Sequence, residues 1–185
     1  VGSCARRTGS RDVRTAFFKT LIDLAAVDSR VSLVVGDLGF GNAESFAERY
    51  PSQFINAGVA EQNMMGVAAG MATCGIVPWL SSFACFLVNR DLDQLRVVVA
   101  QPNLNVKLGA AYSGLLTGKT CKSHQEVSDI AIMRAMPNVT VLAPADGVEV
   151  RLCMLAATAW DGPVYVRLTR APEPVILDES LDFRI

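Results

Sequence analysis

The sequence contains one histidine and no Cys-X-X-Cys pair, and its five cysteines are scattered over the 185 residues. A zinc site or a disulfide framework needs clustered ligands or paired cysteines, so neither is expected. Basic and acidic side chains nearly balance, 17 against 18, which argues against nucleic acid or a membrane surface as the main partner. No apolar run reaches the roughly 18 residues that a membrane-spanning helix needs.

Targeting and nucleotide-binding signals are also missing. The first twelve residues lack the apolar core of a secretory signal, and together with the scattered cysteines this predicts a cytoplasmic protein. Residues 36–42 read Gly-Asp-Leu-Gly-Phe-Gly-Asn. This glycine-rich loop fits neither a Walker loop nor the G-X-G-X-X-G fingerprint, so neither kind of phosphate site is predicted from it.

Hydrophobic residues make up 51% of the chain and charged residues 19%, which suits one domain with a buried core. Short apolar runs alternate with helical patterns throughout the sequence. We expect strands at residues 31–35, 54–55, 77–80, 105–109, 139–142 and 164–168, and helices at 13–27, 44–49, 87–100, 124–136 and 148–158, with one more helix beginning at Glu61. The alternation predicts a three-layer α/β/α fold with a mostly parallel sheet.

The predicted domain covers residues 12–171. Residues 1–11 are expected to form a flexible lead-in, and residues 172–185 a C-terminal tail with prolines and acidic residues. Ligands of a parallel sheet bind beyond the carboxyl ends of its strands. The loop at 110–123 is rich in Gly, Ser, Thr and Lys, and loops of this length in compact domains are usually functional or mobile.

The stretch from Phe54 to Thr73 combines one acid with a helix of small apolar residues. Glu61 lies in the first turn, and Gly66 and Gly70 share one helical face. Each glycine costs about 1 kcal/mol relative to alanine, which predicts that another backbone comes close to that face. Glu61 is open to two interpretations: a partner of the helix dipole, worth about 0.3–1 kcal/mol, or a group that takes part in chemistry.

Three more side chains are candidates from their pattern. Phe83 and Phe86 lie three residues apart, a spacing that is more typical of a hydrophobic core than of a ligand site, although stacked rings hold a flat heterocycle well. His124 is the one histidine of the chain and is expected to open a helix. A lone histidine is usually structural or exposed, so the pattern by itself assigns no role to it.

The residues G-V-A-E-Q-N-M-M-G-V-A-A-G-M-A around Glu61 resemble the segment that carries the catalytic glutamate in thiamine-diphosphate enzymes of the transketolase family. They look most like the separately encoded C-terminal subunits of that family, and the resemblance runs from about Arg14 to Arg170. It implies a pyrimidine-binding domain in which Glu61 is catalytic and hydrogen-bonds N1′ of the cofactor's aminopyrimidine ring.

The resemblance also implies a cofactor wall. The residues S-F-A-C-F resemble the family's aromatic wall, with Phe83 and Phe86 at the matching positions and Asn89 at a third position that is often aromatic. Asp37 matches an acid that faces the cofactor, although a cap or turn role explains it nearly as well. The loop at 36–42 is only loosely similar to the magnesium-binding G-D-G…N motif, because Leu38 replaces the third residue and the spacing is short. No metal ligand is therefore assigned in this chain.

The substrate side of the resemblance has matches and departures. His124 lies in S-H-Q, which matches the Thr-His-Gln or Ser-His-Gln of the family's substrate loop and implies a catalytic and substrate-binding role. The family's preceding G-E-D-G is G-K-T-C here, so Thr120 replaces an acid that reads a sugar hydroxyl, and Tyr112 replaces a histidine. Arg14 and Arg170 match arginines that hold the acceptor's phosphate, but solvated surface charge explains each equally well.

By this resemblance the chain is the pyrimidine-binding subunit of a split enzyme that transfers a two-carbon ketol unit from a ketose or ketose phosphate to an aldehyde. Decarboxylative carboligation of a 2-oxo acid and a non-catalytic partner subunit remain alternatives. The expected cofactors are thiamine diphosphate and Mg²⁺. Because this sequence lacks the diphosphate-magnesium motif, the resemblance places that motif on a partner subunit, within an α2β2 assembly.

Overall fold

The computed structural model describes residues 12–38, 41–170, 174–178 and 180–185. The described chain contains a six-stranded sheet in the order β2-β1-β3-β4-β6-β5, in which every pair of neighbouring strands is parallel. The strands are β1 (Val31–Val35), β2 (Phe54–Asn56), β3 (Val77–Phe83), β4 (Lys107–Ala111), β5 (Thr140–Leu142) and β6 (Val164–Arg167). The predicted lead-in at 1–11 lies outside the described residues.

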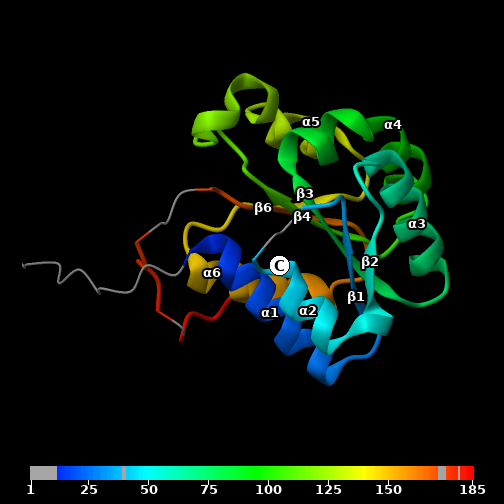
Figure 1. The fold of residues 1–185 in the computed structure, drawn as a ribbon, viewed down its shortest axis with the longest axis horizontal. Coiled ribbons are helices and arrows are strands. Elements are labelled where there is room, and N and C mark those ends of the chain that lie inside the picture. The colour runs from blue at the N-terminus through cyan, green and yellow to red at the C-terminus, as the bar shows by residue number, and fades with distance from the viewer. Residues whose placement is uncertain (1–11, 39–40, 171–173, 179) are drawn as a thin grey trace, which may run out of the picture.

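Helices cover both faces of the sheet (Figure 1). The α-helices are α1 (Val13–Val27), α2 (Ala43–Arg49), α3 (Glu61–Thr73), α4 (Leu92–Gln94), α5 (Asp129–Ala135) and α6 (Gly147–Ala159). Two short 3₁₀ segments, η1 (Pro51–Gln53) and η4 (Gly118–His124), and two π-helical segments, η2 (Phe86–Arg90) and η3 (Leu95–Ala100), complete the list. One face carries α1, α2 and α6, and the other carries α3, α4 and α5, which confirms the three-layer prediction.

Helices cover both faces of the sheet because its strands carry apolar side chains on both sides. In β1, Val31, Leu33 and Val35 belong to the core beneath α1 and α6, whereas Val34 belongs to the core beneath α3. All five residues of β1 are buried. A strand buried on both faces reads as a continuous apolar run, which explains why this strand could be predicted at its correct bounds.

The strand order creates one place where a ligand can bind. The chain leaves β1 toward β2 on one side and later places β3 on the other side of β1. Loops that leave neighbouring strands in opposite directions open a crevice at the carboxyl ends of those strands. Gly36 follows β1 there, Ser81 to Phe83 end β3, and Glu61 begins α3 after β2.

Two predicted helices are wrong in extent. The helix expected at 87–100 is divided into η2, α4 and η3, and the helix expected at 124–136 is formed only by α5. His124 therefore ends η4 and does not open a helix. The chain before α5 is held extended because the backbones of Gly114 and Glu126 pair with each other, and because the Glu126 carboxylate accepts from the backbone N–H and hydroxyl of Ser128.

One further expectation is wrong in extent, and another is not met within the described chain. Residues 110 and 111 belong to β4 and residues 118–124 to η4, so the loop predicted at 110–123 is shorter than expected. Gly66 and Gly70 are exposed, and within the described chain no atom outside the helix lies within 4 Å of a Cβ built on either. The described chain does not itself supply the close backbone approach predicted for that helical face, so this approach stays a prediction. Among the described residues no helix is long and apolar enough to cross a bilayer.

Candidate cofactor and substrate site

Glu61 is a buried acid at the crevice between β1 and β3. It is the first residue of α3 and is only 1% exposed. Its Oε1 accepts a hydrogen bond from the Ser82 hydroxyl at 2.9 Å, and its Oε2 accepts from Nη1 of Arg90. A Cβ at Gly36 would lie 3.4 Å from Oε1, so the end of β1 passes close to the carboxylate. Ser82 of β3 and Arg90 of η2 thus fix the orientation of the Glu61 carboxylate. Pairing with the helix dipole does not require a fixed orientation.

Arg90 is a site residue that the sequence reasoning missed. It ends the π-helical turn η2, and its guanidinium carbon lies 4.0 Å from the centre of the Phe86 ring. The same guanidinium forms the ion pair with Glu61. Two side chains four residues apart on a helix lie close enough to interact, so the spacing of Phe86 and Arg90 was the available signal.

Four rings from four segments meet beside Glu61. Phe83, at the end of β3, lies 4.4 Å from Tyr112 and 5.7 Å from Phe86 between ring centres. His124 lies 5.2 Å from both Phe83 and Phe86, and its Nδ1 is 2.9 Å from the Ser123 hydroxyl. The structure therefore brings together the two predicted phenylalanines, the predicted histidine and Tyr112. Rings in tilted and edge-on contact form a firm wall for a flat ligand.

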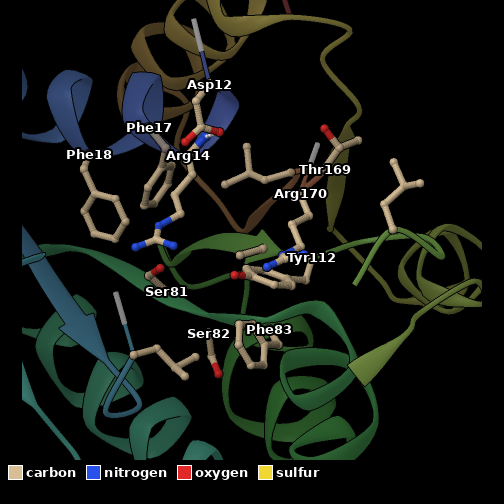
Figure 2. A pocket seen from close by; sticks show the side chains of 14 residues that line it. Asp12, Arg14, Phe17, Phe18, Ser81, Ser82, Phe83, Tyr112, Thr169 and Arg170 are labelled. Carbon is tan, nitrogen blue, oxygen red and sulfur yellow. Dashed lines mark hydrogen bonds between the residues drawn. The ribbon is translucent and has the colours of Figure 1, made fainter. Parts of the chain in front are cut away.

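A cavity of about 620 Å³ opens at the carboxyl ends of β3, β4 and β6. Figure 2 shows Arg14 and Arg170 reaching into it from α1 and from the end of β6, above Ser81 and Phe83. Arg170 lies 5.1 Å from the centre of the Tyr112 ring and donates to the Thr117 carbonyl at 3.4 Å. Two cationic forks over an apolar floor can hold a ligand with an anionic group.

Arg14 is held by the loop after β1. In the orientation of the Asn42 amide that satisfies both groups, its oxygen accepts from Nη2 of Arg14 at 2.9 Å and from Nε at 3.1 Å. Asp12 caps α1 by accepting from the Arg14 backbone N–H at 3.2 Å, and it also lines the cavity. The start of α1 is thereby fixed against the cavity.

The lining of this cavity does not include Glu61, Phe86 or His124, nor Asp37, Thr120 or Asn89. Asp37 is exposed and accepts from the Asn56 amide at 3.2 Å, while its neighbour Leu38 lines the cavity. Thr120 is exposed on η4, where its hydroxyl lies 3.4 Å from the Thr117 carbonyl. Asn89 donates to the Glu126 carboxylate and to the Cys85 carbonyl. The proposed cofactor role of Asp37 and substrate role of Thr120 stay predictions.

Strained backbone gathers around the same crevice. Asp37, Tyr112 and Cys121 have φ angles of 57°, 62° and 52°, in the region that side chains other than glycine rarely adopt. Cys121, with ψ at −155°, occupies the last position of G-K-T-C, where the similar family motif has glycine. Each such residue costs on the order of 1–3 kcal/mol. Strain of this kind persists where the surroundings hold a ligand site in place.

A second buried acid lies beside the ion pair. Asp91 is fully buried, and neither of its carboxylate oxygens has a hydrogen-bond partner within the described chain. Burial raises the pKa of Asp91 to about 8; the backbone N–H of Asp91 and the charge of Arg90 lower the pKa, and the charge of Glu61 raises it. The folded chain therefore holds a proton on Asp91 at pH values where an unfolded chain has lost it.

This proton predicts a pH dependence of stability. Because the folded pKa is raised, the folded state binds more protons than the unfolded state between about pH 4 and pH 8. The free energy of unfolding should fall across that window, by at most about 1.4 kcal/mol per pH unit. Asp91→Asn should remove most of this fall in urea unfolding experiments. Asp93→Asn is the matched control, because Asp93 is exposed; an unchanged slope in Asp91→Asn would contradict the assignment.

No group of three or more His, Cys, Asp or Glu side chains in the described ranges is arranged to hold a metal ion. The chain is an α/β domain with a parallel sheet, and a buried carboxylate, a wall of rings and a cationic cavity at its crevice are suited to a flat, partly anionic ligand. Comparison with known families then gives the particular family. The family model described as transketolase, pyrimidine binding domain, matches residues 10–173, and the chain belongs to this family.

The relatives include separately encoded transketolase subunits. The chain is 40% identical over 171 residues to a putative transketolase C-terminal section of Methanocaldococcus jannaschii, which covers 92% of this chain and 54% of the relative. It is 35% identical to a 6-deoxy-6-sulfo-D-fructose transketolase subunit of a Clostridium species, over 94% of this chain and 54% of that protein. The chain thus spans about half the length of these relatives.

A solved structure agrees with the sequence comparisons. A split-gene transketolase, described as an inactive β4 tetramer, superimposes with a TM-score of 0.84 at 37% identity. The match covers 93% of this chain and 56% of that one. The resemblance to separately encoded transketolase subunits is thereby confirmed.

Proposed function

We propose that the chain is the pyrimidine-binding subunit of a split, thiamine-diphosphate-dependent enzyme that transfers a two-carbon ketol unit to an aldehyde. The observation that carries the proposal is the buried carboxylate of Glu61, which Arg90 links to the wall of Phe86, Phe83, Tyr112 and His124. An aminopyrimidine needs an aromatic wall for its face and an acid for N1′. The residues present fit both requirements, and the family of the chain supports the proposal.

In this mechanism Glu61 holds or shares a proton with N1′ of the aminopyrimidine. The Ser82 hydroxyl, 2.9 Å from Oε1, orients the carboxylate. Phe83 and Phe86 position the ring and exclude water, which strengthens the hydrogen bond at N1′. The cofactor, when bound, supplies the electron sink for the two-carbon unit. A carboxylate fixed by a neighbouring element moves a proton without reorganising its surroundings.

On the substrate side, Arg14 and Arg170 hold an anionic group and His124 closes the substrate loop. Figure 2 shows both guanidinium groups directed into the cavity. One relative is named as a transketolase subunit for 6-deoxy-6-sulfo-D-fructose. A sulfonate is therefore a second anionic group that suits Arg14 and Arg170 of this chain. Tyr112 and Thr120, which replace a histidine and an acid of the family motif, make xylulose 5-phosphate a poor donor in this proposal.

Arg170→Ala tests the anion contact. Loss of a charge-assisted hydrogen bond costs roughly 1.5–3 kcal/mol, so the Michaelis constant for a phosphorylated or sulfonated substrate should rise at least about tenfold. The constant for the matching uncharged substrate should barely change. Arg151→Ala is the matched control, since Arg151 is an exposed arginine of α6 outside the cavity lining. Equal effects of Arg170→Ala on both substrates would remove Arg170 from the anion site.

The partner in this proposal is a separate subunit that binds the diphosphate and Mg²⁺, in an α2β2 assembly. The sequence lacks the G-D-G…N motif, and relatives are named as a subunit or a section of a transketolase. The split-gene transketolase is described as an inactive β4 tetramer. This description supports the need for a second kind of subunit.

A second candidate is the decarboxylative carboligation of a 2-oxo acid. It is favoured by Tyr112 and Thr120, because both depart from the sugar-reading residues of the family motif. A donor screen with the reconstituted pair separates the candidates. Turnover of ketoses or ketose phosphates without carbon dioxide release supports ketol transfer, and release of carbon dioxide from 2-oxo acids supports the alternative.

A further inference from the structure

The Arg90 guanidinium contacts both Glu61 and Phe86, the two side chains that an aminopyrimidine ring would need. Nη1 of Arg90 pairs with Oε2 of Glu61, and the guanidinium carbon lies 4.0 Å from the centre of the Phe86 ring. The backbone carbonyl of Arg90 accepts from the Gln62 amide at 2.9 Å, which ties η2 to the first turn of α3. The Arg90 side chain is 38% exposed, whereas that of Glu61 is 1% exposed.

A guanidinium and an aminopyrimidine share the same recognition chemistry. Both are flat, both present N–H groups in the plane of the ring or fork, and both stack on an aromatic face. A ring that hydrogen-bonds Oε2 of Glu61 and lies on the same face of Phe86 needs the space that the Arg90 guanidinium fills. Arginine and cofactor therefore compete for one position.

We propose that Arg90 and the aminopyrimidine ring compete for one position between Glu61 and Phe86, so that Arg90 must leave it before the ring binds. The inference rests on the proposed cofactor role of Glu61. It identifies Arg90 as a residue that sets the affinity for the pyrimidine. The position of Arg90 also balances the charge of Glu61, since a buried carboxylate without a partner is costly.

The surroundings of η2 give the side chain room to move. A cavity of about 360 Å³ adjoins Arg90 and is also lined by Gln62, Asn89, Asp93 and Gln94. Asp93 lies on the exposed side of this cavity and offers a carboxylate, although Arg96 now pairs with it at 2.6 Å. The move takes Arg90 from Glu61 to solvent and a surface carboxylate, and an aminopyrimidine that hydrogen-bonds Oε2 leaves the buried Glu61 with a partner. A cofactor ring can therefore displace the arginine.

The test uses the pyrimidine half of thiamine, as its hydroxymethyl alcohol, and the single histidine of the chain. His124 lies 5.2 Å from the Phe86 ring, so its imidazole proton signals report a ligand stacked there by NMR titration. Arg90→Met keeps the length of the side chain but removes its charge and flat fork. It should bind the pyrimidine about tenfold tighter than wild type, because a stacked and paired guanidinium no longer competes.

Two variants serve as controls. Arg151→Met removes an exposed arginine of α6 that does not line the cavity beside Arg90, and its affinity should equal that of wild type. Arg90→Gln repeats the test with a polar side chain and should also bind more tightly. Equal or weaker binding by both Arg90 variants, or no binding by wild type and variants alike, would overturn the proposal.

Glu61→Gln separates this inference from the proposed function. If Glu61→Gln loses the pyrimidine while Arg90→Met gains nothing, the competition is wrong and the cofactor role of Glu61 survives. If Glu61→Gln binds as well as wild type, the cofactor role itself fails. Tighter binding by Arg90→Met together with loss in Glu61→Gln supports both.

Discussion

Replacing Glu61 by glutamine should lower the turnover of the reconstituted enzyme by at least about a hundredfold. A positioned acid or base typically contributes about 10²–10⁴-fold to a rate. Glutamine keeps the shape and the polarity of the side chain but cannot give or take the proton at N1′. Glu61 already receives hydrogen bonds from Ser82 and Arg90, so the variant should keep the fold. Steady-state kinetics of the pair with its preferred donor give the measurement.

A matched variant distinguishes catalysis from helix-dipole pairing. Glu44 lies in the first turn of α2 and is exposed, so Glu44→Gln also removes an acid from the start of a helix. It should leave the rate unchanged, with a stability loss no larger than about 0.3–1 kcal/mol. If Glu61→Gln behaves like Glu44→Gln, with a small stability loss and a normal rate, Glu61 is a dipole partner and not a catalytic residue.

The second large effect concerns the partner subunit. The isolated chain should bind thiamine diphosphate weakly and show no turnover, because its sequence lacks the G-D-G…N motif that would hold the magnesium ion and the diphosphate. Adding the subunit that carries the G-D-G…N motif should create activity. The measurement is turnover at fixed chain concentration as the partner is titrated, with Glu61→Gln chain as the control.

Saturation near one partner per chain would agree with an α2β2 assembly. Full activity from the purified chain alone would contradict the split site. Activity with the partner alone, unaffected by this chain, would instead make the chain a non-catalytic subunit.

Much of the fold could be predicted because its elements are strongly patterned. Apolar residues recur at helical spacing from Val13 to Val27, and the structure has α1 at those bounds. The β-branched run from Val31 to Val35 is a wholly buried strand. Both patterns arise from burial, on one face of α1 and on both faces of β1. The spacing of apolar residues in a sequence reflects which faces of an element are buried.

The segments that could not be predicted depend on contacts distant in sequence. The helix expected at 87–100 contains two π-helical segments, which a search at ordinary helical spacing does not distinguish. The start of α5 is fixed by Asp129, which accepts from the Tyr165 hydroxyl at 2.9 Å and from Nε of Arg167 at 2.8 Å. Neither partner is adjacent to Asp129 in the sequence.

For the site, the motif resemblance supplied the residues and the structure supplied their relations. Glu61, Phe83 and Phe86 were candidates from their motifs, and the structure places them together. Neither Arg90 nor Asp91 belongs to a motif that the sequence analysis used. Arg90 belongs to the site because it pairs with Glu61, and Asp91 because its carboxylate is buried without a hydrogen-bond partner in the described chain. Gly66 and Gly70 show the opposite case, since their spacing predicted a contact that the described chain does not make.

The most direct test of the central claim is the exchange of the thiazolium C2 proton of thiamine diphosphate bound to the reconstituted pair, measured by quenched-flow exchange into heavy water. The claim is that Glu61 holds or shares a proton with N1′ and thereby sets the rate at which the C2 proton is lost. Exchange in Glu61→Gln should be at least about a hundredfold slower than in wild type. Equal exchange rates in the two proteins, with the cofactor bound in both, would contradict the catalytic role of Glu61.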